Sequence, residues 1–253
     1  MDIILLLKSL VGKMELLLID AVYQGEVKLD NKTLEYLKRY KSIALYAAVQ
    51  FSSKLENVIK QLEQKGIKVV SSKPARTKEK YQILGCDIYH GNLNLKEDVD
   101  AYLHIGDGRF HPLALVLQQR NLKNFKEVVM YDPIAKKMSM LTLKDVEVIL
   151  KKSKASLKLF LLKKNIGVIL TTKPGQQQYL YSLKLKERYP DKEFYYFIDD
   201  NINSKNFENF PFIDVWVNTA CPRIGLDDAV YVKEPWVNLD EALDAEKRLG
   251  EFS

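Results

Sequence analysis

The residue best suited to chemistry in this sequence is Cys221, which lies in the segment Asn218–Asp228 (NTACPRIGLDD). The apolar run before it, Phe212–Val217, predicts a buried strand, and open α/β sheets bind ligands beyond the carboxyl ends of their strands. Pro222 lacks a backbone N–H, so we expect the thiol to lie on a loop. The positive charge of Arg223 favours the thiolate, the form that binds metals or attacks. The alternative is a small buried residue before an ordinary turn.

A second candidate segment, Gly106–Pro112 (GDGRFHP), lies between a predicted strand and a predicted helix. Its backbone donors and the helix N-terminus suit an anion or a carboxylate. Arg109 can fork onto a carboxylate or phosphate, and Asp107 can hold a ribose hydroxyl or an amine. The glycine spacing matches neither the dinucleotide fingerprint nor the P-loop. We therefore take four residues as cofactor-binding candidates on turn geometry alone: Gly106, Asp107, Gly108 and Arg109.

Other polar positions are weaker candidates. Gln176 ends a similar turn, Thr172–Gln176, and is a further cofactor-binding candidate; the alternative is a plain tight turn. His111 can move a proton, but a histidine next to proline at a helix start is more often structural. His104 falls inside a predicted strand, where we expect a hydrogen-bonded core residue, and His90 is a poor site candidate. We identify no other catalytic side chain.

The two cysteines, Cys86 and Cys221, form the most informative pair. Each follows an apolar run, and the two fall in different predicted domains. A thiolate from each can share one metal centre, and soft thiolates without a nearby histidine favour iron–sulfur over zinc. The sequence contains no HExxH, CxxC or serine-elbow motif. Two ligands are too few to hold a cluster, so the pair alone leaves the metal site incomplete.

The elements that position these residues alternate between strand and helix. This order predicts an α/β fold with parallel sheets flanked by helices, in two similar domains after an N-terminal remnant of a third. We assign the remnant to residues 1–22, the domain with Cys86 to residues 23–145, and the domain with Cys221 to residues 146–253. Strands are expected at residues 43–49, 67–70, 101–105, 128–131, 166–170, 194–198 and 212–217. Helices are expected near residues 31–40, 52–66, 113–119, 143–164, 176–188 and 239–249.

Composition narrows the class of protein. Of the 253 residues, 47% are hydrophobic and 28% charged, as in ordinary globular domains. Two cysteines exclude a disulfide scaffold and indicate a reducing compartment. No apolar stretch approaches 18 residues and no signal-peptide pattern is present, so we expect a cytoplasmic protein without a membrane contact. The net charge of +6 is spread along the chain, and we expect no direct binding of nucleic acid.

Three segments taken together closely resemble the diphthamide-synthesis family. They are Gln82–Cys86 (QILGC), Tyr102–Leu115 (YLHIGDGRFHPLAL) and Asn218–Asp228. The resemblance implies an archaeal or eukaryotic enzyme for the first modification step on a histidine of translation elongation factor 2. It implies a 4Fe-4S cluster, held by one cysteine from each of three similar α/β domains, that binds S-adenosylmethionine. Cleavage would give a 3-amino-3-carboxypropyl radical that adds to the imidazole. The archaeal members resemble homodimers.

Carried over by position, Cys86 and Cys221 resemble the second-domain and third-domain cluster ligands. Gly106–Arg109, Gln176 and Arg223 are assigned to S-adenosylmethionine from charge and turn geometry, since the family motif gives them no such role. The cysteine-bearing first domain has no counterpart here, and residues 1–22 resemble only its last helix and strand. We therefore expect a homodimer or a separate first-domain partner.

Two other functions stay open at this point. One is a cluster-free accessory subunit of the same pathway, which binds elongation factor 2 or a partner. The other is an unrelated α/β protein that binds a nucleotide or phosphate and whose cysteines are structural, a reading that only the generic fold supports.

Overall fold

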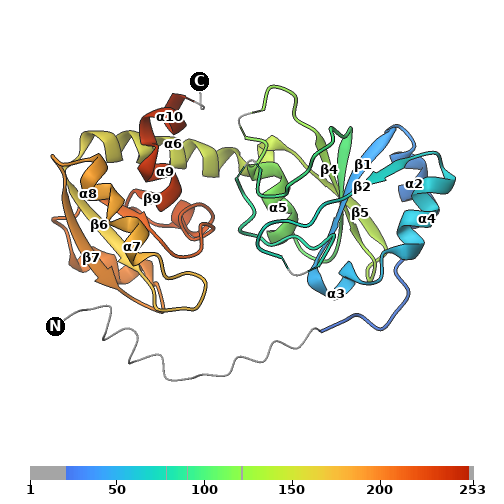
Figure 1. Ribbon diagram of the computed structural model, residues 1–253, viewed down its shortest axis with the longest axis horizontal. Helices are drawn as coiled ribbons and strands as arrows, with labels where there is room; N and C mark the ends of the chain where they lie inside the picture. The colour runs from blue at the N-terminus through green and yellow to red at the C-terminus, as the bar shows by residue number, and fades with distance from the viewer. Residues whose placement is uncertain (1–20, 78, 90, 121, 251–253) are drawn as a thin grey trace. The chain divides into compact units, whose positions relative to one another are not determined.

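A computed structural model describes residues 21–77, 79–89, 91–120 and 122–250. This part of the chain divides into two compact units, Ala21–Lys151 and a second that begins at Lys152, each built on its own β-sheet (Figure 1). The division falls inside a helix, six residues beyond the expected boundary at 145/146. The expected remnant at residues 1–22 lies, except for its last two residues, outside the described residues.

The first unit contains a five-stranded sheet in the order β2-β1-β3-β4-β5, in which the first four strands are parallel. The fifth strand pairs antiparallel with β4. The strands are β1 (Ser42–Ala47), β2 (Lys68–Val70), β3 (Ala101–Ile105), β4 (Glu127–Asp132) and β5 (Lys137–Leu141). The helices are α2 (Asn31–Leu37), α3 (Val49–Ser52), α4 (Glu56–Gln64) and α5 (Phe110–Leu117).

Local signals explain the helices on one face of this sheet. Asp30 caps α2 by accepting a hydrogen bond from the Thr33 N–H at 2.7 Å, and Leu34 and Leu37 of α2 are buried. Gly66 follows the C-cap of helix α4, and its φ of +78° suits glycine. The buried faces of both helices join one core with alternate residues of β1, β3 and β4. Figure 1 shows α5 on the opposite side of the sheet from α2 and α4.

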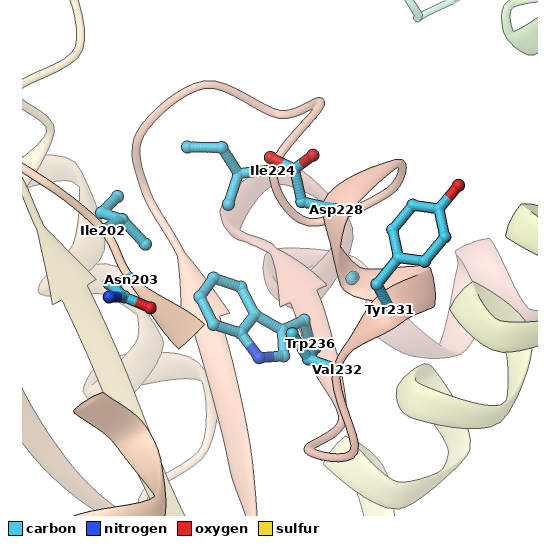
Figure 2. A pocket seen from close by; sticks show the side chains of 8 residues that line it. Ile202, Asn203, Ile224, Asp228, Tyr231, Val232 and Trp236 are labelled. Atoms are coloured by element: carbon cyan, nitrogen blue, oxygen red, sulfur yellow. The ribbon is translucent and has the colours of Figure 1, made fainter. Parts of the chain in front are cut away.

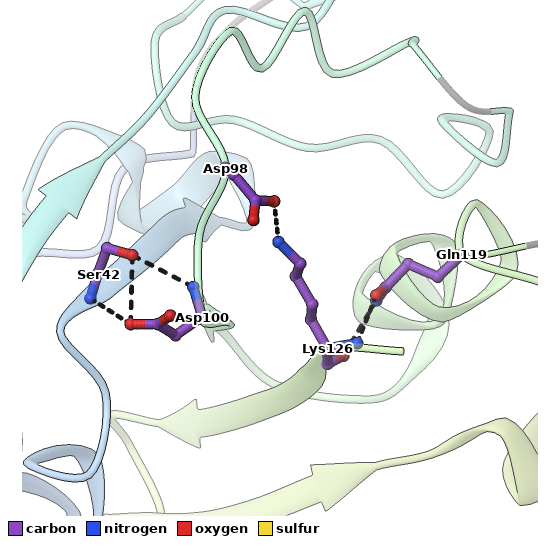
Figure 3. A network of polar contacts seen from close by, with 5 residues as sticks. All are labelled: Ser42, Asp98, Asp100, Gln119 and Lys126. Atoms are coloured by element: carbon purple, nitrogen blue, oxygen red, sulfur yellow. Dashed lines mark hydrogen bonds and ion pairs between the residues drawn. The ribbon is translucent and has the colours of Figure 1, made fainter. Parts of the chain in front are cut away.

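A polar network holds the amino ends of the strands, away from their carboxyl ends (Figure 3). The carboxylate of Asp100, which precedes β3, accepts hydrogen bonds from the N–H groups of Lys41 and Ser42 at 2.7 and 2.9 Å. Lys126, which precedes β4, forms an ion pair with Asp98 and donates its N–H to the side chain of Gln119 at 2.8 Å. These contacts fix three adjacent strand starts and leave the carboxyl edge for other groups.

The second unit contains a four-stranded, fully parallel sheet in the order β7-β6-β8-β9. Its strands are β6 (Asn165–Leu170), β7 (Glu193–Ile198), β8 (Val215–Asn218) and β9 (Trp236–Asn238). Its α-helices are α7 (Tyr179–Ser182), α8 (Lys184–Arg188), α9 (Leu239–Leu243) and α10 (Ala245–Gly250), and short 3₁₀ turns are η2 (Ser204–Asn209) and η3 (Asp228–Tyr231). Helix α6 (Glu147–Leu162), preceded by η1 (Leu143–Val146), spans the division between the units.

The expected α/β class with parallel sheets is confirmed, and several element boundaries are wrong. Helix α5 begins at Phe110, so Pro112 is its third residue and not its first. The expected strand at 212–217 begins only at Val215, because Phe212 is exposed on the approach to the sheet. The expected helices at 176–188 and 239–249 are each broken in two. Strands β5 and β9 were not expected.

None of the helices in the described ranges is both long and apolar enough to cross a membrane.

Candidate functional site

Cys86 lies just beyond the carboxyl end of β1, an inner strand of the first sheet. The segment before it extends the sheet: the Ala47 N–H donates to Tyr81 O at 2.7 Å, and the Ile83 N–H donates to Ala47 O at 3.1 Å. Three residues after this contact the chain reaches Cys86, which is half-buried and present as a thiol. The sequence indicated only that Cys86 follows an apolar run; the structure places it at the end of β1, after a segment that bonds to Ala47.

The turn around Cys86 is built by a buried carboxylate. Asp87, which is fully buried, accepts a hydrogen bond from the Leu84 N–H at 2.8 Å, and its own N–H donates to Leu84 O at 3.1 Å. Burial raises the pKa of Asp87, and the hydrogen bond from Leu84 opposes that shift. On the other side, the Phe110 ring covers Gly85 so closely that a Cβ there would overlap it. Both sequence neighbours of Cys86, Gly85 and Asp87, are thus held in place.

The glycine turn Gly106–Arg109 lies at the same edge. The Gly106 N–H donates to Tyr131 O at 3.0 Å, which ties the turn to the end of β4. A Cβ at Gly106 would lie 2.8 Å from the His104 ring and 3.0 Å from the Ala48 side chain, so only glycine fits without a shift. Gly108 has a φ of +68°, which also favours glycine. The glycines therefore have a backbone role whatever the turn binds.

The two charged residues of this turn have partners within the unit. Asp107 Oδ1 accepts a hydrogen bond from Gln50 Nε2 at 2.9 Å. Arg109 forms an ion pair with Asp145, which also accepts a hydrogen bond from the Thr142 N–H at 2.7 Å. Partial burial acts to raise the pKa of Asp145, but the bonds from Thr142 and Arg109 outweigh it and the pKa is lowered.

A pocket of about 300 Å³ opens beside this turn. Gly106, Gly108 and Arg109 line it together with Asp145 and residues of the β4–β5 hairpin. Asp107 is not among its lining residues. Three of the four candidates in this turn therefore share one cavity, while Asp107 contacts Gln50.

His104 differs from its sequence-based interpretation. It lies in β3 and is fully buried, as expected, but neither ring nitrogen has a hydrogen-bond partner among the described residues. Burial lowers the pKa of His104 to about 3, and the nearby His111 contributes to the same direction. The ring is therefore neutral at physiological pH. The expectation of a hydrogen-bonded histidine is wrong, because a position buried on a parallel sheet offers its side chain few backbone partners.

Cys221 occupies the corresponding edge of the second sheet. It lies three residues beyond the end of β8, and it too is a half-buried thiol. Asn218, the last residue of β8, donates from Nδ2 to Cys221 O at 2.8 Å and accepts from the Ala220 N–H at 3.1 Å. The Ile224 N–H also donates to Cys221 O, at 3.0 Å. The expected loop placement of this thiol is thus found.

A residue that the sequence did not single out, Asn238, holds the far side of the loop. It lies in β9 and donates from Nδ2 to Pro222 O at 2.9 Å. Its Oδ1 accepts a hydrogen bond from Asn218 Nδ2 at 2.8 Å. A Cβ on Gly225 would overlap the Asn238 side chain, so Gly225 provides close approach to the asparagine. The amide pairing depends on β8 and β9 lying side by side, which no local motif indicates.

Arg223 is buried and bonded to Asp227, with its Nε 2.8 Å from Asp227 Oδ2. The spacing of four residues between opposite charges is a sequence signal that could have indicated this pair. The roles of Arg223 toward the thiolate and toward a cofactor stay predictions.

Two neighbouring pockets lie on the second unit, and both are lined by Ile202 and Ile224. One, of about 320 Å³, contains Gln176 together with Thr171 and Lys173, so Gln176 does face a cavity. The other, of about 390 Å³, has the Trp236 indole in its wall and Asp228 and Tyr231 on one side (Figure 2).

The chemistry available is that of two half-buried thiols, one at the carboxyl edge of each sheet. Their donor type fits an iron–sulfur cluster, which thiolates hold. Within the described ranges, no three His, Cys, Asp or Glu side chains come together as a metal site. A cluster with three protein ligands would therefore need one ligand beyond these two cysteines.

Comparisons with a family profile, with curated relatives and with solved structures all point to the same family. A family profile described as a diphthamide synthesis protein matches residues 14–248. The 2-(3-amino-3-carboxypropyl)histidine synthase of Methanocaldococcus jannaschii is 29% identical over 186 residues, which cover 72% of this chain and 52% of the relative. The enzyme of the same name from Pyrococcus horikoshii is 29% identical over 198 residues, covering 77% and 54%. Human subunit 1 of the synthase is 27% identical over 204 residues, covering 79% and 44%.

The fold has solved counterparts. Crystal structures of Dph2 from Pyrococcus horikoshii, one of them with a 4Fe-4S cluster, match with a TM-score of 0.68 at 24–25% identity. The match covers 87% of this chain and 60% of that protein. The chain thus spans about half the length of the curated relatives it matches. A family match over nearly the whole chain leaves little support for an unrelated nucleotide-binding protein.

Proposed function

The chain belongs to the diphthamide synthesis protein family, and on that premise we propose that it acts in the first step of diphthamide biosynthesis. The reaction is the transfer of a 3-amino-3-carboxypropyl group from S-adenosylmethionine to a histidine of translation elongation factor 2. The observation that carries this proposal is the placement of both cysteines as half-buried thiols at the carboxyl edges of two parallel sheets. Membership of this family also leads us to propose elongation factor 2 as the protein substrate and the cytoplasm as the location.

Cys86 and Cys221 are the residues that would hold the iron–sulfur cluster. When bound, a 4Fe-4S cluster would supply an open iron for the methionine group and the electron that cleaves the carbon–sulfur bond. The chain's own contribution is to present the thiols. Asp87 fixes the Cys86 turn, and Asn218 fixes the Cys221 loop through the cysteine carbonyl. A cluster with three protein ligands would need one more ligand beside these two cysteines.

The two arginine candidates differ in the free energy needed to separate each from its present carboxylate partner. Arg109 is more than half exposed, with 57% of its side chain accessible, and an exposed ion pair contributes only about 0–1 kcal/mol. It can leave Asp145 for a carboxylate of S-adenosylmethionine at little cost. Arg223 is buried on Asp227, and breaking a buried pair costs about 3–5 kcal/mol. Arg109, with Gly106 and Gly108, is therefore the stronger candidate for binding S-adenosylmethionine. Arg223 instead stabilises the Cys221 loop through its bond to Asp227.

A cluster-free accessory subunit is the second candidate function. It is favoured by the presence of only two cysteines in this sequence, which are too few to hold a cluster. Such a subunit would bind elongation factor 2 or a catalytic partner without carrying out the transfer.

The test is anaerobic reconstitution of the full chain with iron and sulfide, followed by electron paramagnetic resonance after reduction with dithionite. We compare the wild type with Cys86→Ser, Cys221→Ser and the surface control Asp191→Asn. S-adenosylmethionine labelled in its carboxypropyl group and elongation factor 2 then report the transfer. The enzyme predicts a cubane-type signal in wild type and control that shifts with S-adenosylmethionine, label on elongation factor 2, and loss of both with either serine variant.

The accessory subunit predicts the reverse pattern. No cluster signal forms, no label is transferred, and elongation factor 2 still binds all four proteins with similar affinity. Label transfer that persists in Cys221→Ser would contradict the role of that thiol as a ligand.

A further inference from the structure

The larger pocket of the second unit is separate from the residues assigned to the cluster and to S-adenosylmethionine (Figure 2). One wall is formed by Ile202 and Asn203, which follow β7. The opposite wall is formed by residues of the β8–β9 connection, and the Trp236 indole lies between the two walls. Its volume of about 390 Å³ lies at the lower end of the range for ligand pockets.

Asp228 determines the charge of this pocket. Among the described lining residues it is the only one that is charged at neutral pH. Two cations lie outside the lining: Arg223, whose charge acts on Asp228, and Lys152, whose Nζ donates to the carbonyl oxygen of Val232. Partial burial raises the pKa of Asp228, the adjacent Asp227 adds to the rise, and Arg223 opposes it. A cation in the pocket would favour the carboxylate, so the electrostatics suit a positively charged occupant.

Aromatic groups give the pocket its second property. The Trp236 side chain is almost completely buried and is supported from behind by Phe207, with 5.2 Å between ring centroids. Tyr231 is 89% exposed at the pocket's edge. A cation that approaches a tryptophan or tyrosine face gains about 0.5–2 kcal/mol, and arginine does so most often. A carboxylate together with aromatic rings is the chemistry that recognises a guanidinium or an ammonium group.

The pocket's position connects it to the candidate cluster site. Ile224 lines the pocket, and its N–H donates to Cys221 O at 3.0 Å. The Ala229 N–H, from the same wall, donates to Ile224 O at 3.0 Å. An occupant would thus rest against the loop that presents Cys221, where a protein substrate must come if its histidine is to be modified. The highly exposed Tyr231 at the edge also suits contact with a protein surface, since tyrosine and arginine are enriched in interfaces.

We propose that this pocket receives a basic side chain, arginine or lysine, of the protein substrate and thereby docks that substrate beside Cys221. The inference rests on the proposed function, because it takes the occupant from the protein that is to be modified. In this arrangement Asp228 pairs with the charged group of the basic side chain. Trp236 and Tyr231 contact the apolar stem of that side chain and its cationic end.

Nuclear magnetic resonance of the two tryptophan indole N–H groups tests this directly. The chain has only two tryptophans, and Trp216 lies behind Phe207, so its signal is an internal reference for Trp236. The probes are N-acetyl-arginine methylamide, adenosine and intact elongation factor 2, added to the full chain without a cluster. The variants are Asp228→Asn, Tyr231→Ala and the control Asp191→Asn, an exposed carboxylate outside the pocket.

The arginine derivative and elongation factor 2 are expected to shift the Trp236 signal more than the Trp216 signal. Asp228→Asn and Tyr231→Ala should each weaken binding of elongation factor 2 about tenfold, and Asp191→Asn should leave it unchanged. Tyr231→Ala keeps the test valid if Asp228→Asn disturbs the loop, because the tyrosine is exposed. A Trp236 signal that responds to adenosine and not to the arginine derivative would overturn the proposal, as would unchanged binding by both variants.

Failure of this proposal can be distinguished from failure of the proposed function. If elongation factor 2 is modified normally by both pocket variants and leaves Trp236 unmoved, the docking proposal is wrong and the transferase function stands. If elongation factor 2 shifts Trp236 but is never modified, the docking proposal stands and the transferase function is wrong.

Discussion

Asn218 and Asn238 form a side-chain pair beneath the Cys221 loop, with Asn218 Nδ2 donating to Asn238 Oδ1 at 2.8 Å. Both residues are only 2% exposed. Each also bonds to a loop carbonyl, Asn218 to that of Cys221 and Asn238 to that of Pro222. The pair therefore couples the ends of two neighbouring strands to the backbone on either side of the thiol.

Replacement of Asn238 by alanine is expected to loosen this loop. The change leaves Pro222 O without its buried donor and removes an acceptor from Asn218, and each unsatisfied group costs about 1–3 kcal/mol. We expect the free energy of unfolding to fall by about 3 kcal/mol, measured with urea. The exposed Asn209→Ala is the control and should change it by less than about 0.5 kcal/mol.

A second readout separates positioning of the thiol from stability alone. In a Cys86→Ser background, the rate at which iodoacetamide alkylates Cys221 should rise in Asn238→Ala under conditions where the protein stays folded. An unchanged alkylation rate would mean that Asn238 stabilises the unit without positioning the cysteine.

Gly225→Ala should destabilise the same loop from the opposite side. A Cβ at this position overlaps the Asn238 side chain, whose hydrogen bonds prevent it from moving away. Overpacking of this kind typically costs about 1–3 kcal/mol. The cost should become smaller in an Asn238→Ala background, because the clash is then relieved. A double-mutant cycle in urea measures this coupling, and strictly additive effects would contradict it.

Local signals were sufficient to predict those parts of the structure that depend on neighbours in sequence. Asp30 marks the start of α2, and the apolar run at Ala101–Ile105 is β3 without error. The loop placement of Cys221 followed from its proline and from the strand before it. These features need only chain periodicity, capping and turn chemistry.

The parts that sequence reasoning missed depend on contacts between distant residues. Strand β9 has three residues and no periodic signal, and Asn238 acquires its role only by pairing in register with Asn218. Arg223 is buried and bonded to Asp227, an arrangement that depends on how the whole loop folds. His104 was placed correctly in a buried strand, but its lack of hydrogen bonds depends on the whole environment of the side chain.

Arg109 and Asp145 are expected to differ in their effects on stability although they form one ion pair. Arg109→Ala removes an exposed partner and should cost less than about 1 kcal/mol. Asp145→Ala also removes the acceptor for the Thr142 N–H at the start of η1, and loss of such a cap costs about 0.5–2 kcal/mol. Thermal unfolding measures both changes.

The same arginine variant tests the proposed recognition of S-adenosylmethionine. If Arg109 binds the carboxylate of this cofactor, Arg109→Ala should weaken its binding at least about tenfold in calorimetry, since bonds to charged groups contribute about 1.5–3 kcal/mol. Arg39→Ala, which removes an arginine that lies over the Tyr36 ring, is the control. Equal affinities in all three proteins would exclude Arg109 from the cofactor site.

Burial of His104 should make the protein lose stability as the pH falls. Its pKa is about 3 in the folded protein and about 6.5 when exposed, so between these values the unfolded chain binds a proton that the folded chain does not. The stabilisation is therefore complete above about pH 6.5 and declines by up to about 1.4 kcal/mol per pH unit as the pH falls toward 3. Burial raises the pKa of Asp87, which opposes this trend, so a variant is needed to isolate the histidine.

His104→Leu removes the titrating ring and two buried nitrogens that lack partners among the described residues. Its free energy of unfolding in urea should depend less on pH between 4 and 6 than that of the wild type. At pH 7 it should match or exceed the wild type, because an unsatisfied buried polar group is costly. His111→Gln is the control and should keep the steep dependence. If His104→Leu and the wild type lose stability in parallel from pH 6 to 4, the ring does not become protonated on unfolding, and the acid sensitivity lies in other groups.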